Sequence, residues 1–229
     1  GPPSEWRVIE DTPSGDYFYG LMEVPAGWFR MEIRLLGPDD AVMHIAETGP
    51  FGVGEVILTA GQSNSANSGE VALVPLDPRV SAWGYSGWGP AVDPQPIATG
   101  TGGSPWPHLG DLLASKWGVP IGFYSIGWGG TSVSQWRPQV ENGLFNRFRD
   151  VFQQVGPHGL RFILWHQGES DVGLKQSHDY AAQLEEVIAA TRVEAGWDIP
   201  WGVARASFVP GALQTDMDQI AAGQDAVIN

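Results

Sequence analysis

GEVILTAGQSNSANSG, residues 54–69, changes from apolar to polar within a few positions. The apolar run is typical of a buried strand, and the Gly, Asn and Ser cluster after it is typical of a turn. In a parallel sheet, reactive side chains are displayed where a strand ends. The stretch therefore predicts the first strand of such a sheet, with Gln62, Ser63 and Asn64 at its carboxyl end.

Strands and helices alternate along the rest of the chain. Apolar runs predict three further strands, at 119–127, 160–166 and 198–208. Apolar residues at helical spacing predict helices at 108–118, at 143–156, from Ser177 and from about Leu213. Such alternation implies right-handed crossovers and a sheet covered on both faces. We therefore predict an α/β fold, a three-layer sandwich with a central parallel sheet, over residues 53–229.

Residues 1–52 show a different pattern. Apolar and charged side chains alternate at 28–36, which predicts a strand with one polar face. A segment of this length is short for an independent sandwich, so we expect a small N-terminal β appendage packed on the α/β domain. Residues 81–104, rich in Gly, Pro and Trp, form a long predicted loop and are a candidate wall of a binding site.

Composition limits the possible partners. The chain has 229 residues, 12 Lys plus Arg against 26 Asp plus Glu, and a formal net charge of −14. This charge disfavours nucleic acid and anionic membrane surfaces. The chain has no Cys, which excludes disulfides and thiolate metal sites. An acidic, Trp-rich and Cys-free composition favours a secreted or periplasmic protein.

Two further polar motifs follow predicted strands. SIGWGGTSVSQW, residues 125–136, contains paired glycines whose N–H groups can approach a ligand closely. WHQGESD, residues 165–171, presents an imidazole, an amide and two carboxylates. Taken alone, each motif could be a polar loop or a helix cap. The spacing of His166, Glu169 and Asp171 matches no standard zinc pattern, so no metal is predicted.

Together, GQSN at 61–64, GGT with a following Trp at 129–136, and WHQGESD resemble the SGNH (GDSL-like) hydrolases. The resemblance is to their sialate O-acetylesterase and acetylxylan esterase branch, carbohydrate esterase family six, and covers roughly residues 53–229. It implies a flavodoxin-like SGNH fold and a serine esterase that removes O-acetyl groups from a carbohydrate, either an acetylated polysaccharide or sialic acid. The reaction would pass through an acyl-enzyme on Ser63 and would need no cofactor.

The resemblance also implies roles for single residues. Ser63 would be the nucleophile, and the N–H groups of Ser63 and Gly130 would hold the oxyanion. The side-chain amide of Gln167 or Asn64 would be a third donor, and Glu169 would orient the base histidine. The expected substrate contacts are made by Gln62, His166, Trp128 and Trp136.

The family's base is a histidine near the C-terminus, in an Asp-x-x-His loop after a fifth strand. The last histidine of this sequence is His178, so neither that loop nor that strand is found. We expect the domain to be C-terminally incomplete, with the missing strand and base on a separate or lost polypeptide segment, so that this fragment alone could be inactive. Alternatively, His166 serves as the base.

Two other functions compete with the esterase. One is a non-catalytic carbohydrate-binding module that keeps the SGNH fold without its base histidine. The other is a glycosidase that uses Glu169 and Asp171. It is less favoured, because catalytic carboxylate pairs need about 5 to 9.5 Å between them and usually come from separate elements. The remaining histidines are expected at the surface or at helix caps: His44, His108, His158 and His178.

Overall fold

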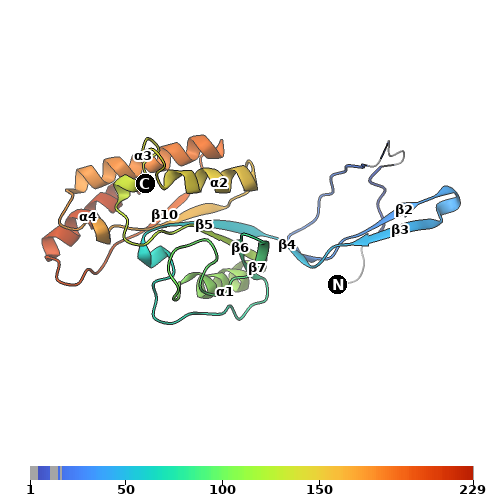
Figure 1. Ribbon diagram of the computed structural model, residues 1–229, viewed down its shortest axis with the longest axis horizontal. Helices are drawn as coiled ribbons and strands as arrows, with labels where there is room; N and C mark the ends of the chain where they lie inside the picture. The colour runs from blue at the N-terminus through green and yellow to red at the C-terminus, as the bar shows by residue number, and fades with distance from the viewer. Residues whose placement is uncertain (1–4, 11–14, 16, 229) are drawn as a thin grey trace.

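The computed structural model describes residues 5–10, 15 and 17–228, and a six-stranded sheet forms its centre (Figure 1). The strands lie in the order β10 (Trp201–Ala204), β9 (Phe162–His166), β5 (Glu55–Gly61), β8 (Ile121–Ser125), β6 (Val80–Gly84) and β7 (Gly87–Pro90). The pairs from β10 to β6 are parallel, and β7 runs antiparallel to β6.

Helices cover both faces of this sheet. Helix α1 (Trp106–Trp117) lies on one face, and three helices lie on the other: α2 (Phe145–Val155), α3 (Ser177–Ala195) and α4 (Gln214–Ala226) (Figure 1). The predicted α/β sandwich with a central, mostly parallel sheet is thus confirmed. The predicted end of α1 is confirmed as well, because Gly118 caps it in the left-handed conformation, with φ 72°.

Each face of the sheet has its own hydrophobic core. Under α2 and α3, Trp165 of β9 packs edge-on against Trp136, with ring centroids 5.4 Å apart, and both side chains are fully buried. Under α1, the ring centroids of Phe123 of β8 and Trp106 lie 6.2 Å apart. Truncation of such a buried aromatic side chain to Ala costs about 3 to 5 kcal/mol. These two cores therefore hold the strand ends in place.

Residues 81–104 are not one long loop, and that prediction is wrong. Strands β6 and β7 form a hairpin that extends the sheet, with Trp83 opposite Trp88. Trp83 also stacks on Tyr124 of the neighbouring strand β8, with centroids 5.4 Å apart. Gly and Ser interrupt the apolar alternation at 80–90, which hides the strand signal. The two tryptophans therefore stabilise a sheet edge.

The N-terminal region forms two small antiparallel pairs. Strand β1 (Gly27–Phe29) pairs with β4 (Phe51–Val53), while β2 (Glu32–Leu36) and β3 (Val42–Glu47) are joined through the 3-10 turn η1 (Pro38–Asp40). The β2–β3 hairpin projects away from the sheet, and β3 is exposed along its whole length (Figure 1). The expectation that this region packs on the α/β domain is therefore wrong for β2 and β3. The single strand predicted at 28–36 is split in two.

Strand β10 lies at the edge of the sheet, paired only with β9 among the described residues. On the face that carries α1, the region next to β10 is open, as a hollow of about 360 Å³. It is lined by Pro105, Trp106, Leu164, Trp165, His166, Gly202, Val203 and Ala204. Within the part of the chain that the structure describes, no helix is long and apolar enough to cross a bilayer.

The carboxyl end of β5 depends on a glycine. Gly61 has φ 124°, and a Cβ there would lie 2.2 Å from the backbone oxygen of His166. We expect Gly61→Ala to lower the free energy of unfolding by about 2 to 4 kcal/mol, the sum of backbone strain and overpacking. Chemical denaturation measures this loss.

The matched control is Gly118→Ala. Gly118 also has a positive φ, but a Cβ there would meet nothing within 4 Å. This variant should lose only the strain contribution, on the order of 1 kcal/mol. Equal losses of unfolding free energy in the two variants would contradict the proposed steric role of Gly61.

Candidate active site

The three polar motifs meet at the carboxyl ends of β5, β8 and β9. The Gln62 N–H donates to His166 O at 3.0 Å, which joins the first motif to the third. The Trp128 N–H donates to Gly61 O at 2.8 Å, which joins the second motif to the first. Residues more than 100 positions apart in the sequence are therefore held together through the backbone.

Ser63 is the first residue of a 3-10 turn, η2 (Ser63–Ser65), directly after β5. The N–H groups at the start of such a turn have no acceptor within it, so they are available to a ligand. Ser63 itself is half-buried. This placement suits a nucleophile whose own N–H helps to bind the oxygen of the group under attack.

Gly130 lies in the turn that follows β8. It is exposed and has φ 72°, which favours glycine. The preceding N–H, of Gly129, donates to Thr99 Oγ1 at 2.7 Å and fixes the turn. The Gly130 N–H donates to no acceptor among the described residues. It is therefore free to bind a ligand, as the resemblance implies.

His166, Glu169 and Asn64 form a connected group. His166 Nε2 lies 3.4 Å from Glu169 Oε1, and Asn64 Nδ2 donates to the same oxygen at 2.5 Å. Burial acts to raise the pKa of Glu169, but hydrogen bonds from His166, from its own backbone and from Asn64 outweigh burial. The net effect is a pKa below the ordinary value. Glu169 is therefore an ionised carboxylate at neutral pH.

One oxygen of Glu169 has no partner. Its Oε2 is buried and accepts no hydrogen bond from the described residues. A buried carboxylate oxygen without a donor is costly, so a donor supplied by a ligand or by another side chain would be strongly favoured here. This free oxygen suits the predicted role of Glu169, which is to orient a base.

Gln167 is fully buried and faces the protein. Its Nε2 donates to Thr131 O at 3.0 Å and to Asp171 Oδ2 at 2.6 Å. Both amide hydrogens thus serve to hold the loop. Gln62 is also buried, and its Oε1 accepts hydrogen bonds from the N–H groups of Gly168 and Ser170.

Asp171 connects the second motif to the third. It is fully buried, and its Oδ2 also accepts from the Val133 N–H at 2.8 Å. Val133 begins the 3-10 turn η3 (Val133–Trp136), and Asp171 ends the turn η4 (Glu169–Asp171). A carboxylate without solvent access cannot act on a sugar, so the Glu169 and Asp171 pair does not support a glycosidase. The described residues contain no group of three His, Asp or Glu side chains that could hold a metal ion.

The two tryptophans predicted to contact substrate have different surroundings. Trp128 is 41% exposed beside Gly130, with the Arg147 guanidinium 5.0 Å from its ring centroid. Trp136 is fully buried against Trp165, and its Nε1 donates to Thr131 Oγ1. The expectation for Trp136 is therefore wrong, because its ring forms part of the core. Trp128 remains available to a substrate.

Sequence reasoning missed two residues that support the site. Tyr180 of α3 donates its hydroxyl hydrogen to Gln167 O, and Gln224 of α4 donates to the same oxygen at 2.7 Å. Burial raises the pKa of Tyr180 far above its ordinary value, so the hydroxyl stays protonated and remains a donor. No local sequence signal marks either residue, because both reach the site only through helix packing.

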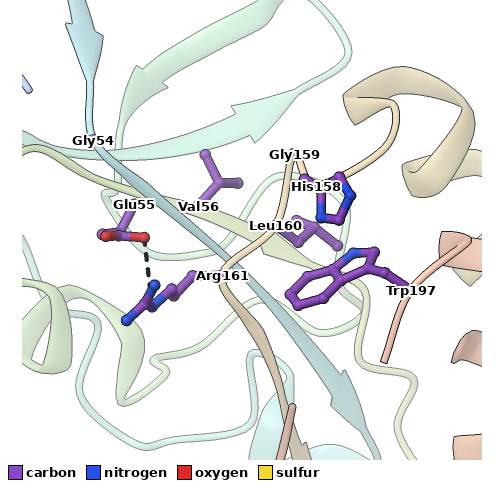
Figure 2. A pocket seen from close by; sticks show the side chains of 8 residues that line it. All are labelled: Gly54, Glu55, Val56, His158, Gly159, Leu160, Arg161 and Trp197. Carbon is purple, nitrogen blue, oxygen red and sulfur yellow. Dashed lines mark ion pairs between the residues drawn. The ribbon is translucent and has the colours of Figure 1, made fainter. Parts of the chain in front are cut away.

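A second hollow, of about 300 Å³, lies at the opposite end of the sheet (Figure 2). There the rings of His158 and Trp197 lie with their centroids 5.1 Å apart. Arg161 forms an ion pair with Glu55, with a nitrogen–oxygen distance of 3.8 Å. These residues come from the amino ends of β5 and β9 and from the neighbouring loops. The hollow is therefore separate from the three motifs.

The chain matches a family model described as carbohydrate esterase, sialic acid-specific acetylesterase, over residues 53–223. No curated protein sequence matches it closely enough to be counted as a relative.

Three solved structures are similar in fold. A protein from Arabidopsis thaliana has 18% identity and a TM-score of 0.64, over 76% of this chain and 82% of its own. A carbohydrate acetylesterase from Xanthomonas citri has 19% identity and a TM-score of 0.58, over 80% of this chain and 49% of its own. NanS has 17% identity and a TM-score of 0.51, over 76% of this chain and 72% of its own. Since the family model covers most of the sequence, this chain belongs to the sialic acid-specific acetylesterase family of carbohydrate esterases.

Proposed function

We propose that this protein is a serine esterase that removes O-acetyl groups from a carbohydrate through an acyl-enzyme on Ser63. Family membership supports an esterase. The observation that carries the proposal is the position of Ser63, directly after the central strand and next to the Asn64, Glu169 and His166 group. Glu169 is the carboxylate that a serine, histidine and acid mechanism needs.

In this mechanism the Ser63 hydroxyl attacks the acetyl carbonyl carbon while a base accepts its proton. The N–H groups of Ser63 and Gly130 bind the oxygen that becomes negative. The bond from carbon to the sugar oxygen then breaks, and the sugar hydroxyl takes the proton from the base. Water attacks the acyl-enzyme in the same way, which releases acetate and restores Ser63.

The base has two candidate sources. In the described residues, no histidine is hydrogen-bonded to Ser63 Oγ, and His166 is directed to Glu169. We propose that a histidine on a further polypeptide segment supplies the base, docked over the open edge of β10 and the hollow beside it. Its ring N–H would donate to the unpartnered Oε2 of Glu169. If this segment is absent and activity persists, His166 is the base.

For the substrate we propose either an acetylated polysaccharide or an O-acetylated sialic acid. The family description names sialic acid, and the structurally similar Xanthomonas citri enzyme is a carbohydrate acetylesterase. The exposed ring of Trp128 next to Gly130 suits stacking on the apolar face of a sugar. A second candidate function, carbohydrate binding without catalysis, is favoured only because no base is hydrogen-bonded to Ser63 within the described part of the chain.

Ser63→Ala should abolish hydrolysis of a chromogenic acetyl ester, with a loss of at least about 10³-fold, because loss of a nucleophile that acts with its base removes most of the catalysis. The assay includes Ser68→Ala, an exposed serine of the same loop, as a control that should keep wild-type activity. Intact mass on the same sample identifies any second polypeptide. A wild-type protein that binds acetylated glycan but hydrolyses no ester would instead favour the binding module.

Glu169→Gln should change how stability depends on pH. Because the pKa of Glu169 is lowered in the folded protein, its ionised form stabilises the fold above the ordinary pKa of about 4.5. That contribution is lost as the pH falls through the lower folded pKa. Urea unfolding should show a gap between wild type and variant of about 1.5 kcal/mol at pH 6, typical of hydrogen bonds to a charged group. The gap should shrink towards pH 3.

The control is Glu185→Gln, on the exposed side of α3. Its difference from wild type should be small at every pH, as for an ordinary surface substitution. If the difference in unfolding free energy between wild type and Glu169→Gln stays constant or widens on acidification, Glu169 is not a stabilised carboxylate.

A further inference from the structure

The side-chain amide of Gln62 has one possible orientation. Its Oε1 accepts from the N–H of Gly168 at 3.3 Å and from the N–H of Ser170 at 3.0 Å. A backbone N–H can only donate, so the atom that faces these two groups must be the oxygen. The usual ambiguity between oxygen and nitrogen of a glutamine amide is thereby removed.

The other end of this amide faces the nucleophile. Gln62 Nε2 lies 3.5 Å from Ser63 Oγ, and no other acceptor among the described residues bonds to it. A contact of this length is weak, so the amide keeps its capacity to donate to a closer oxygen. The residue is only 4% exposed, which means that water does not easily satisfy this donor. A buried donor whose only acceptor in the described part of the chain is the weak contact with Ser63 Oγ therefore lies beside the nucleophile.

Of the two amides that the family resemblance offers as a third oxyanion donor, Gln167 is fully occupied and Asn64 commits one of its two hydrogens to Glu169. Gln167 Nε2 has two hydrogens and three protein acceptors, Thr131 O, Asp171 Oδ2 and Gln62 Oε1. Its Nε2 faces the carbonyl oxygen of Thr131, which can only accept, so the orientation of this amide is settled as well. Asn64 is exposed and directs its amide to the carboxylate of Glu169.

We propose that the side-chain amide of Gln62 is the third donor to the oxyanion that forms on Ser63, and that Gln167 only positions the loop. In the tetrahedral adduct the oxyanion and Ser63 Oγ are bonded to the same carbon. A donor next to Oγ is thus close to the oxyanion too, and it donates to a full negative charge there. This inference rests on the proposed esterase function.

The decisive variant is Gln62→Glu. The new carboxylate keeps the oxygens that accept from Gly168 and Ser170, so the loop stays anchored, but when ionised it cannot donate. At pH 8 we expect kcat for an acetyl ester to fall about 10²- to 10³-fold, the usual effect of losing an oxyanion donor, with KM nearly unchanged. The affinity for a trifluoromethyl ketone, which adds to serine as a tetrahedral oxyanion, should fall by a similar factor.

The matched control is Gln167→Glu. It makes the same chemical change in the same buried network and keeps the oxygen that lies 3.0 Å from the Tyr180 hydroxyl. It places a second carboxylate against Asp171, so we expect a lower thermal midpoint but a smaller loss of kcat in the folded protein than in Gln62→Glu. Thermal unfolding of both variants separates stability from catalysis.

The outcomes are distinct. Wild-type kcat and inhibitor affinity in Gln62→Glu would overturn the inference and leave the esterase proposal intact. A greater loss of kcat in folded Gln167→Glu than in Gln62→Glu would return the role to Gln167. A wild-type protein as inactive as Ser63→Ala would overturn the proposed function, and this inference with it.

Discussion

The contact on which the site depends is the backbone of Gly61 against that of His166. A side chain at position 61 would meet the main chain of β9, so only glycine allows the central strand and its neighbour to end side by side. Their adjacency brings Asn64, the residue after Ser63, into hydrogen-bond contact with Glu169, although the two are far apart in the sequence. The arrangement of the site therefore depends first on the absence of a side chain at position 61, and only then on its charged groups.

A network of buried polar groups makes this arrangement specific. Gln62, Gln167 and Asp171 lie beneath the turns. Gln62 and Asp171 accept from main-chain N–H groups and Gln167 donates to a main-chain carbonyl, and these groups would otherwise lack a partner in the protein. A buried polar group that loses its partner costs about 1 to 3 kcal/mol, so the network favours one conformation of the loops. The described exceptions include Glu169 Oε2 and Asp171 Oδ1, which accept no hydrogen bond, although Asp171 Oδ1 lies 3.8 Å from the Lys175 ammonium group. An unsatisfied oxygen within the group formed by His166, Glu169 and Asn64 indicates function more than stability.

Much of the fold followed from pattern, because strands covered on both faces and amphipathic helices leave strong periodic signals. The three motifs at 61–64, 129–136 and 165–171 together pointed to the family that the family model confirms. Other features were hidden for physical reasons. Glycines masked the β6–β7 hairpin, and Trp136 looks the same in sequence whether its ring is buried or exposed. The different roles proposed for Gln62 and Gln167 depend on which hydrogen bonds each amide makes. Only the folded chain shows these hydrogen bonds.

Helix α4 is bound into the site in a way that bears on how the protein unfolds. The Gln224 side chain accepts from the Ala206 N–H and donates to Gln167 O, so it bridges the chain after β10 to the loop after β9. Detaching the helix would leave Gln167, and with it the turn that contains Glu169, without part of its support. We therefore expect α4 and the loop at 167–171 to unfold as one cooperative unit. Their amide hydrogens should exchange together and not in separate local openings.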